Sequence, residues 1–152
     1  MHLTSFALKT TLAVTIIALS LLFLMACKTI DFNPQTYTGD YITIGEGGGI
    51  AGIETSYHIL PNGKTFKQSS IDTAHTQLPS LDKAAVQQAL ASYQNLALDE
   101  YSFEDPGNIY RFMSFQVEGK INRIVWHDEE KIRKECVQIY RILHGLIQKE
   151  KK

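Results

Sequence analysis

Alternation of apolar and polar residues predicts β-strands in the first part of the chain beyond residue 40. Residues 41–44 and 53–59 carry β-branched and aromatic side chains in near alternation, as half-buried strands do. The second stretch then meets Pro61-Asn62-Gly63-Lys64, in which proline presets the first turn position and glycine accepts a positive φ. We therefore expect residues 65–68 to return antiparallel to residues 53–59 as a hairpin.

A second hairpin is predicted in the later part of the chain. The acidic loop of residues 99–105 runs into Asp105-Pro106-Gly107-Asn108, which is a strong turn signal. Residues 109–117 and 121–126 follow, rich in aromatic and β-branched residues, and the turn at residues 118–120 separates them. These two stretches are expected to pair with each other.

Two other stretches space their apolar residues as amphipathic helices do. We expect the first helix to be capped by Ser80 and to end near Leu98. The second is expected to be capped by Asp128, with Glu129 and Glu130 in a first turn where the helix dipole favours carboxylates. The expected apolar faces are Leu81, Ala85, Leu90, Tyr93 and Leu96 in the first helix, and Ile132, Cys136, Ile139, Tyr140, Leu143 and Ile147 in the second.

The order of these elements predicts an α+β fold. We expect an antiparallel sheet of about five strands, made of two hairpins and an N-terminal strand, with both helices packed on one face. The other sheet face is expected to meet water or a partner. This single domain is expected to span residues 41–148, with a charged tail at residues 149–152. Residues 27–40, which contain the breakers Pro34 and Gly39, are expected to form a tether.

The N-terminal segment has a different pattern, because its apolar residues are continuous. Lys9 precedes an uncharged run from Leu12 to Leu24, which is shorter than the about 20 residues that a membrane-spanning helix needs. The run ends in Leu24-Met25-Ala26-Cys27, a small-residue cleavage site followed by a thiol. This segment resembles a bacterial lipoprotein signal peptide with its lipobox.

That resemblance implies removal of residues 1–26 and attachment of a diacylglycerol to the sulfur of Cys27. It also implies that the new terminal amine is acylated, for example with palmitate, so that the mature protein is anchored in a membrane of the cell envelope. Cys27 is followed by Lys28 and not by aspartate. By similarity to the sorting rules of enteric bacteria, this favours the outer membrane.

Charge and cysteine content argue against a nucleic-acid-binding protein and against a domain held together by disulfides. The chain has 15 Lys and Arg against 16 Asp and Glu, and loss of Lys9 with the leader makes it slightly more acidic. Nothing therefore supplies the basic footprint that a nucleic-acid partner requires. Of the two cysteines, Cys27 is committed to lipid and Cys136 falls on an apolar helix stripe, so no disulfide framework is expected.

The glycine-rich residues 47–52 match the dinucleotide-binding pattern G-x-G-x-x-G. That site needs a helix opening at the third glycine, whereas a strand and a turn are predicted here. Two interpretations stay open: a permissive strand connection, or a rim loop over residues 45–52 that a partner's backbone can approach closely. The candidate loop residues are Gly45, Gly47, Gly48, Gly49 and Gly52.

Other chemistry-bearing residues do not form a recognisable set. The histidines of the mature chain lack metal-ligand spacing, and no serine lies in a G-x-S-x-G context. The cluster His127-Asp128-Glu129 would suit a cation, but a strand-to-helix junction with a cap is favoured. The acidic loop lacks the alternate-residue spacing of an EF-hand. We therefore expect no catalytic residue, metal or cofactor.

The part of the chain after residue 40 also resembles a group of small, uncharacterised envelope lipoproteins. In these, a glycine-rich stretch precedes a tyrosine-bearing strand and an Asn-Gly turn, and a Pro-Gly-Asn-x-Tyr segment precedes a strand ending in tryptophan. The matching parts here are Gly47 to Gly52, Tyr57, Asn62-Gly63, Pro106 to Tyr110 and Ile124-Val125-Trp126. The resemblance implies no particular activity.

Together, these patterns predict a lipid-anchored envelope protein that acts as a binding or assembly module. Its expected partners are the membrane, through the N-terminal lipid, and an envelope protein or cell-wall component. Two alternatives stay open: a periplasmic inhibitor of an envelope hydrolase that inserts a loop into a cleft, and a small metal-dependent or hydrolytic enzyme.

Overall fold

The computed structural model describes residues 32–150 of the chain. The predicted signal peptide, lipobox and lipidated Cys27 lie outside the described residues, as do Lys151 and Lys152. Neither helix in the described range has the length and apolar character needed to cross a membrane.

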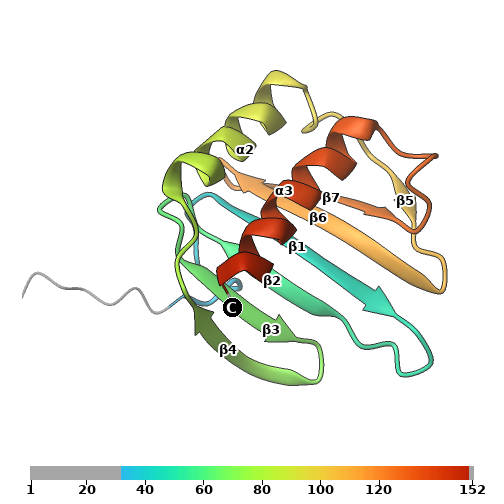
Figure 1. Ribbon diagram of the computed structural model, residues 1–152, viewed down its shortest axis with the longest axis horizontal. Coiled ribbons are helices and arrows are strands. Elements are labelled where there is room, and N and C mark those ends of the chain that lie inside the picture. Colours follow the sequence, from blue (N-terminus) through green and yellow to red (C-terminus); the bar gives the residue numbers. More distant parts are fainter. Residues whose placement is uncertain (1–31, 151–152) are drawn as a thin grey trace, which may run out of the picture. The chain divides into compact units, whose positions relative to one another are not determined.

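A seven-stranded sheet with the order β4-β3-β2-β1-β6-β7-β5 forms one layer of the fold (Figure 1). Five of the six strand pairs are antiparallel, and the short β5 pairs with β7 in parallel. The predicted antiparallel α+β sheet is confirmed, but the expected number of strands was too low. The strands are β1 (Tyr41–Gly48), β2 (Thr55–Ile59), β3 (Thr65–Ser69), β4 (Asp72–Leu78), β5 (Glu104–Asp105), β6 (Ile109–Val117) and β7 (Lys120–Trp126).

The two strands that the sequence pattern missed lie at the sheet edges. Strand β4 reads Asp-Thr-Ala-His-Thr-Gln-Leu, and as an edge strand it needs no regular alternation of apolar residues. Strand β5 has only two residues, inside the predicted acidic loop, and it is held by backbone pairing with β7. In both places backbone hydrogen bonding, and not side-chain burial, makes the strand.

Two helices, α2 (Lys83–Asn95) and α3 (Lys134–Glu150), cover the same face of the sheet, as Figure 1 shows. The expected cap of the first helix was wrong, because Asp82 and not Ser80 occupies that position. The Asp82 carboxylate accepts a hydrogen bond of 2.8 Å from the backbone N–H of Ala85. Pro79 and Ser80 instead belong to the connection that leads into the helix.

The expected start of the second helix was also wrong. Helix α3 begins at Lys134, and the Asp128 carboxylate accepts from the backbone N–H of Glu130 at 3.0 Å within a preceding turn. The acidic residue in the first turn of α3 is Glu135. Asp128 therefore caps a turn before the helix, an arrangement with the same sequence signal as a helix cap.

The core lies between the helices and the strands beneath them. The apolar stripe predicted for the last helix is confirmed, since all six of its residues are buried, although Ile132 lies just before α3 begins. Of the face expected for the first helix, Leu81 and Tyr93 are buried and Leu90 and Leu96 pack partly buried against the core. Val86 and Ala89 are also buried in α2, which was not predicted. The strands contribute Ile42, Ile44, Tyr57, Ile59, Met113, Phe115, Ile124 and Trp126 to this core.

Candidate interaction surface

The predicted glycine loop is not a single loop, because β1 continues as far as Gly48. Gly45 lies opposite Phe112 and Gly47 opposite Tyr110 on the neighbouring β6. A Cβ at Gly45 would lie 2.5 Å from the Phe112 ring, and one at Gly47 would lie 2.7 Å from the Tyr110 ring. These two glycines therefore let aromatic rings cross the backbone of β1, and the rim-loop interpretation was wrong for them.

The remaining three candidate glycines shape the connection between β1 and β2. Gly48, Gly49 and Gly52 have positive φ values, and the N–H of Gly49 donates to the carbonyl of Asn108 at 2.7 Å. A Cβ at Gly49 or Gly52 would meet no atom within 4 Å. Their role in the structure is to bend the chain, and the side chain presented at the tip of the bend is Ile50.

Exposed isoleucines gather at this end of the sheet, a feature that the sequence analysis missed. Ile50 is fully exposed at the tip of the β1–β2 connection, and Ile53 follows it. Ile71, which is 76% exposed, lies in the turn between β3 and β4, and Ile109, 67% exposed, opens β6. Because neighbouring strands are antiparallel, all of these positions fall at the same end of the sheet (Figure 1). We call these four residues the isoleucine edge.

Backbone pairing keeps the members of this edge close together. Ile109 pairs with Gly48, two residues before Ile50. The N–H of Ser70, beside Ile71, donates to the carbonyl of Glu54, beside Ile53, at 2.8 Å. The isoleucine edge is therefore one connected set of positions in the turns and at a strand end, on a hydrogen-bonded framework.

A polar network lies beside this edge on the sheet face opposite the helices. The Glu54 carboxylate accepts from the Tyr110 hydroxyl at 3.0 Å and from the Arg123 guanidinium at 2.7 Å. The guanidinium also lies 3.9 Å above the centre of the Phe112 ring. The network joins the start of β2 to β6 and β7, and it covers the strand glycines with ordered side chains.

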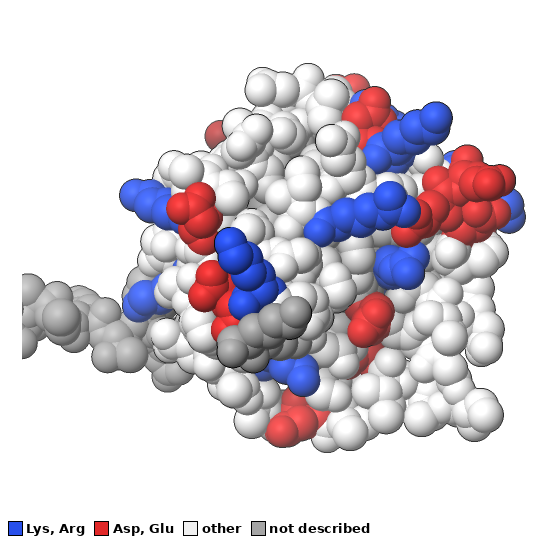
Figure 2. Space-filling view, in the orientation of Figure 1, with Lys and Arg blue, Asp and Glu red and all other residues white. Residues whose placement is uncertain are grey.

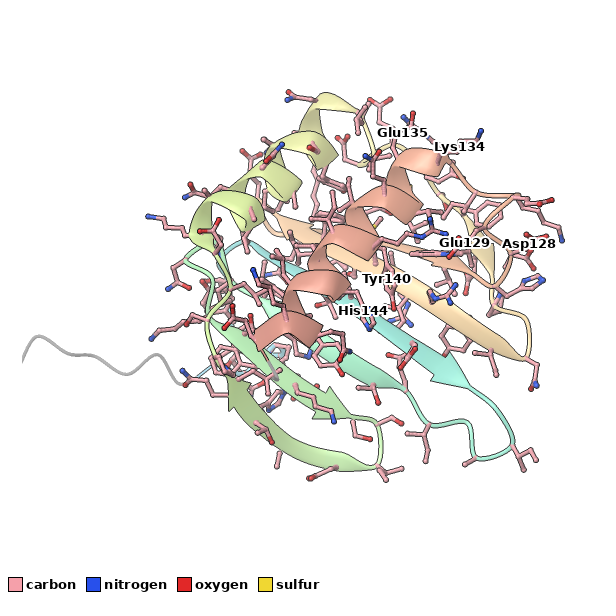
Figure 3. All side chains as sticks on the ribbon, in the orientation of Figure 1. Asp128, Glu129, Lys134, Glu135, Tyr140 and His144 are labelled. Atoms are coloured by element: carbon pink, nitrogen blue, oxygen red, sulfur yellow. The ribbon has the colours of Figure 1, made fainter. Side chains whose placement is uncertain are left out.

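A polar cavity of about 330 Å³ opens at the same end, between α3 and the helix-side surface of β1 and β6. Glu129 pairs there with Arg111 at 2.9 Å and also with Arg141. Burial raises the pKa of Tyr140 to about 12, so its hydroxyl keeps its proton at neutral pH. The rings of His144 and Tyr140 stack with their centres 5.6 Å apart. Figure 3 shows both residues on α3 and shows Glu129 in the segment that precedes this helix. The carboxylates of Glu46 and Glu129 balance the guanidinium groups of Arg111 and Arg141 in the lining of this cavity.

Neither positive nor negative charge predominates on the outer surface of the helices. Figure 2 shows acidic and basic side chains interspersed over this face. An open hollow of about 530 Å³ lies along α3, lined by Glu129, Lys134, Val137, Gln138, Arg141 and Ile142. On the face that Figure 2 shows, the described residues form no continuous basic surface for nucleic acid or for an anionic membrane.

His127, Asp128 and Glu129, which were considered for a cation site, each contact different partners. His127 Nδ1 lies 3.3 Å from the Asp105 carboxylate, which also faces Lys131 Nζ at 3.5 Å. Asp128 accepts from the turn, and Glu129 binds the two arginines. The side chains of His127, Asp128 and Glu129 therefore do not converge on one point. Within residues 32–150, no three or more His, Cys, Asp or Glu side chains gather into a metal-binding group.

Cys136 lies fully buried in the core, on the helix stripe where the sequence placed it. Burial raises the pKa of its thiol to about 11, so the sulfur stays protonated at neutral pH. A protonated, inaccessible thiol is a poor nucleophile and a poor metal ligand.

A scan against protein-family models gives no match for this chain, and no curated protein matches its sequence.

The sequence did contain a signal for the isoleucine edge. Ile50 and Ile71 lie among glycine, alanine, serine and aspartate in turns, where a large apolar side chain has no strand face to cover it.

Proposed function

We propose that this protein is a lipid-anchored bacterial envelope protein that acts as a binding or assembly module through its isoleucine edge. The observation that carries the proposal is the exposure of four isoleucines around the turns at one end of the sheet. Clustered exposed apolar side chains on a soluble domain are typical of a protein contact surface. The lipobox-like residues 24–27 support the anchor.

The position of the edge suits such an anchored module. Strand β1 starts at Tyr41, where the chain leaves the N-terminal segment, and ends at Gly48 beside the isoleucine edge. Eight residues of strand extend roughly 27 Å. The isoleucine edge therefore lies at the strand ends farthest from the entry of the chain, where it is available to an envelope partner.

The interaction is tested by cross-linking in cells that express the full chain. Replacing Ile50, Ile71 and Ile109 together by serine should remove the cross-linked partner species while the melting curve of the domain stays close to that of the wild type. A matched control replaces Ile121 and Ile142 by serine, because these are also exposed but lie elsewhere. Equal loss in both variants, or no loss in either, would contradict the role of the edge.

The anchor is tested separately with the variant Cys27→Ser. A fatty-acid probe should label the wild-type chain and leave the variant unlabelled, because the lipid is attached through sulfur and two or more acyl chains give stable anchoring. Equal labelling of both chains would remove the basis for the membrane location.

The inhibitor alternative is favoured by one specific observation, the projection of Ile50 from the tip of the bend between Gly49 and Gly52. A single exposed apolar side chain on a narrow turn suits insertion into an enzyme cleft. In that case Ile50→Ser alone should abolish binding, and Ile71→Ser and Ile109→Ser should leave it unchanged. A flat contact surface would instead spread the loss over all three substitutions.

A further inference from the structure

The last residues before β1 pack against the sheet instead of extending from it. Phe32 is 3% exposed and lies on the sheet face opposite the helices. Its ring stacks on Phe66 at 4.8 Å and lies 5.5 Å from the rings of both Tyr41 and His58. The tether expected to run from residue 27 to residue 40 was therefore wrong from Phe32 onward.

Hydrogen bonds hold the rest of this segment in place. The side-chain amide of Gln116, on β6, donates to the carbonyls of Tyr37 and Gly39, at 3.0 Å in each case. The Asp40 carboxylate accepts from the backbone N–H of Glu118 at 2.9 Å. Residues 32–40 thus form a strap fixed by a buried aromatic ring and three hydrogen bonds. We call this arrangement the Phe32 clamp.

We propose that the Phe32 clamp sets the height of the domain above its membrane; this inference rests on the proposed lipid anchor at Cys27. Five residue steps separate Cys27 from Phe32, and covalent geometry limits them to roughly 18 Å. A free tether as far as Tyr41 would reach roughly 50 Å. Docking the strap removes most of that reach.

The clamp also restricts the partner. With the strap docked, Gly48 at the isoleucine edge lies no more than about 50 Å from the lipid-bearing residue, counting the steps to Phe32, the contact of Phe32 with Tyr41 and the length of β1. The surface that fits this geometry belongs to a protein embedded in, or bound to, the same membrane. A component that the domain reaches only at the end of a long free tether does not fit.

Energy transfer to the membrane tests the clamp in the lipidated full chain. A donor dye is placed on Asn62→Cys, an exposed turn position at the clamp end of the sheet, and acceptor lipids are added to vesicles that carry the purified protein. The native thiol of Cys136 is buried and does not compete for the dye. Phe32→Ala should lower the transfer efficiency roughly twofold, because the strap can then extend.

Two control variants calibrate this measurement. An eight-residue Gly-Ser insertion between residues 31 and 32 lengthens the tether without touching the clamp, and it should lower the transfer as strongly as Phe32→Ala. Gln35→Ala changes an exposed residue of the same strap and should leave the transfer unchanged. If Phe32→Ala does not fold, Gln116→Ala replaces it and should give a partial decrease, because it removes only two of the hydrogen bonds.

The outcomes separate this inference from the proposal on which it rests. A lipidated, folded clamp variant with unchanged transfer shows that the clamp does not set the height, and so does an insertion without effect. Purified protein that carries no lipid overturns the anchor itself, and the inference fails with it. A decrease in the clamp variant and in the insertion, but not in Gln35→Ala, supports the proposal.

Discussion

The two faces of the sheet are covered in different ways. On one face, two amphipathic helices bury a continuous apolar core that includes Phe115 and Trp126. On the other, a short N-terminal strap covers one end and a polar network centred on Glu54 covers the other. The first cover is thick and apolar, whereas the second is thin and depends on single rings and hydrogen bonds. We therefore expect packing on the helix side to contribute most of the free energy of unfolding. Contacts on the opposite face are expected to rearrange more easily.

The largest effect should come from truncating the core on the helix side. Phe115 is fully buried and stacks on Tyr93 of α2 at 3.9 Å. Phe115→Ala should lower the free energy of unfolding by about 4 kcal/mol, because it removes a large apolar side chain and leaves a cavity. Urea unfolding measures this change. The exposed Ile121→Ala should shift the same curve by less than about 0.5 kcal/mol; equal losses would mean that the core has been misplaced.

Acid should have the next largest effect, through the opposite face. His58 is 7% exposed, between the Thr43 hydroxyl at 2.9 Å and the Gln68 carbonyl oxygen at 3.2 Å. Burial lowers its pKa to about 4; the charge of His75 adds to this lowering, while the hydrogen bond to Gln68 and the charge of Glu54 oppose it. The folded state therefore favours neutral imidazole.

The sign of the pH dependence follows from that preference. At pH values above the unfolded-state pKa of about 6.5, His58 makes its full contribution to stability, because the imidazole is neutral in both states. Between pH 6.5 and 4 the unfolded chain binds a proton at this imidazole and the folded chain does not. Stability should fall by about 3 kcal/mol over this range. Carboxylates also begin to titrate there, so the measurement is the slope of the wild type minus that of His58→Gln. Parallel curves would show that His58 is not the source.

Removing the clamp should have a smaller and more local effect. Phe32→Ala should cost about 2 kcal/mol, below the usual cost of truncating a buried phenylalanine, because the strap can detach while the sheet stays folded. Hydrogen exchange should then speed up at the amides of residues 35–40 and remain slow in α3. Faster exchange in both regions would show that the strap is part of the global folding unit.

The difference between the two faces also explains what the sequence could predict. The α3 stripe was predictable because Cys136, Ile139 and the other stripe residues repeat at helical spacing, and the two hairpins carry clear turn signals. The strap has no period, and its Phe32 is buried by residues distant in sequence. Gly45 and Gly47 looked like loop glycines because a single sequence does not reveal that aromatic rings cross them. Ile50 lies among glycines, and such a run indicates backbone freedom without showing which side chain the bend exposes.

The smallest effect is expected in the polar network beside the isoleucine edge. The side chain of Arg123 is 43% exposed, so its ion pair with Glu54 is screened by water, although the guanidinium also packs over Phe112. Arg123→Ala should cost only about 1 kcal/mol, and the part due to the ion pair should shrink in 1 M salt. A double-mutant cycle with Glu54→Gln measures the coupling, which should be about 0.5 kcal/mol. A coupling several times larger would show that this thin cover contributes as much stability per residue as the helix side, and the contrast between the faces would then fail. If the coupling is small but Arg123→Ala weakens partner cross-linking, the network instead positions the isoleucine edge for contact.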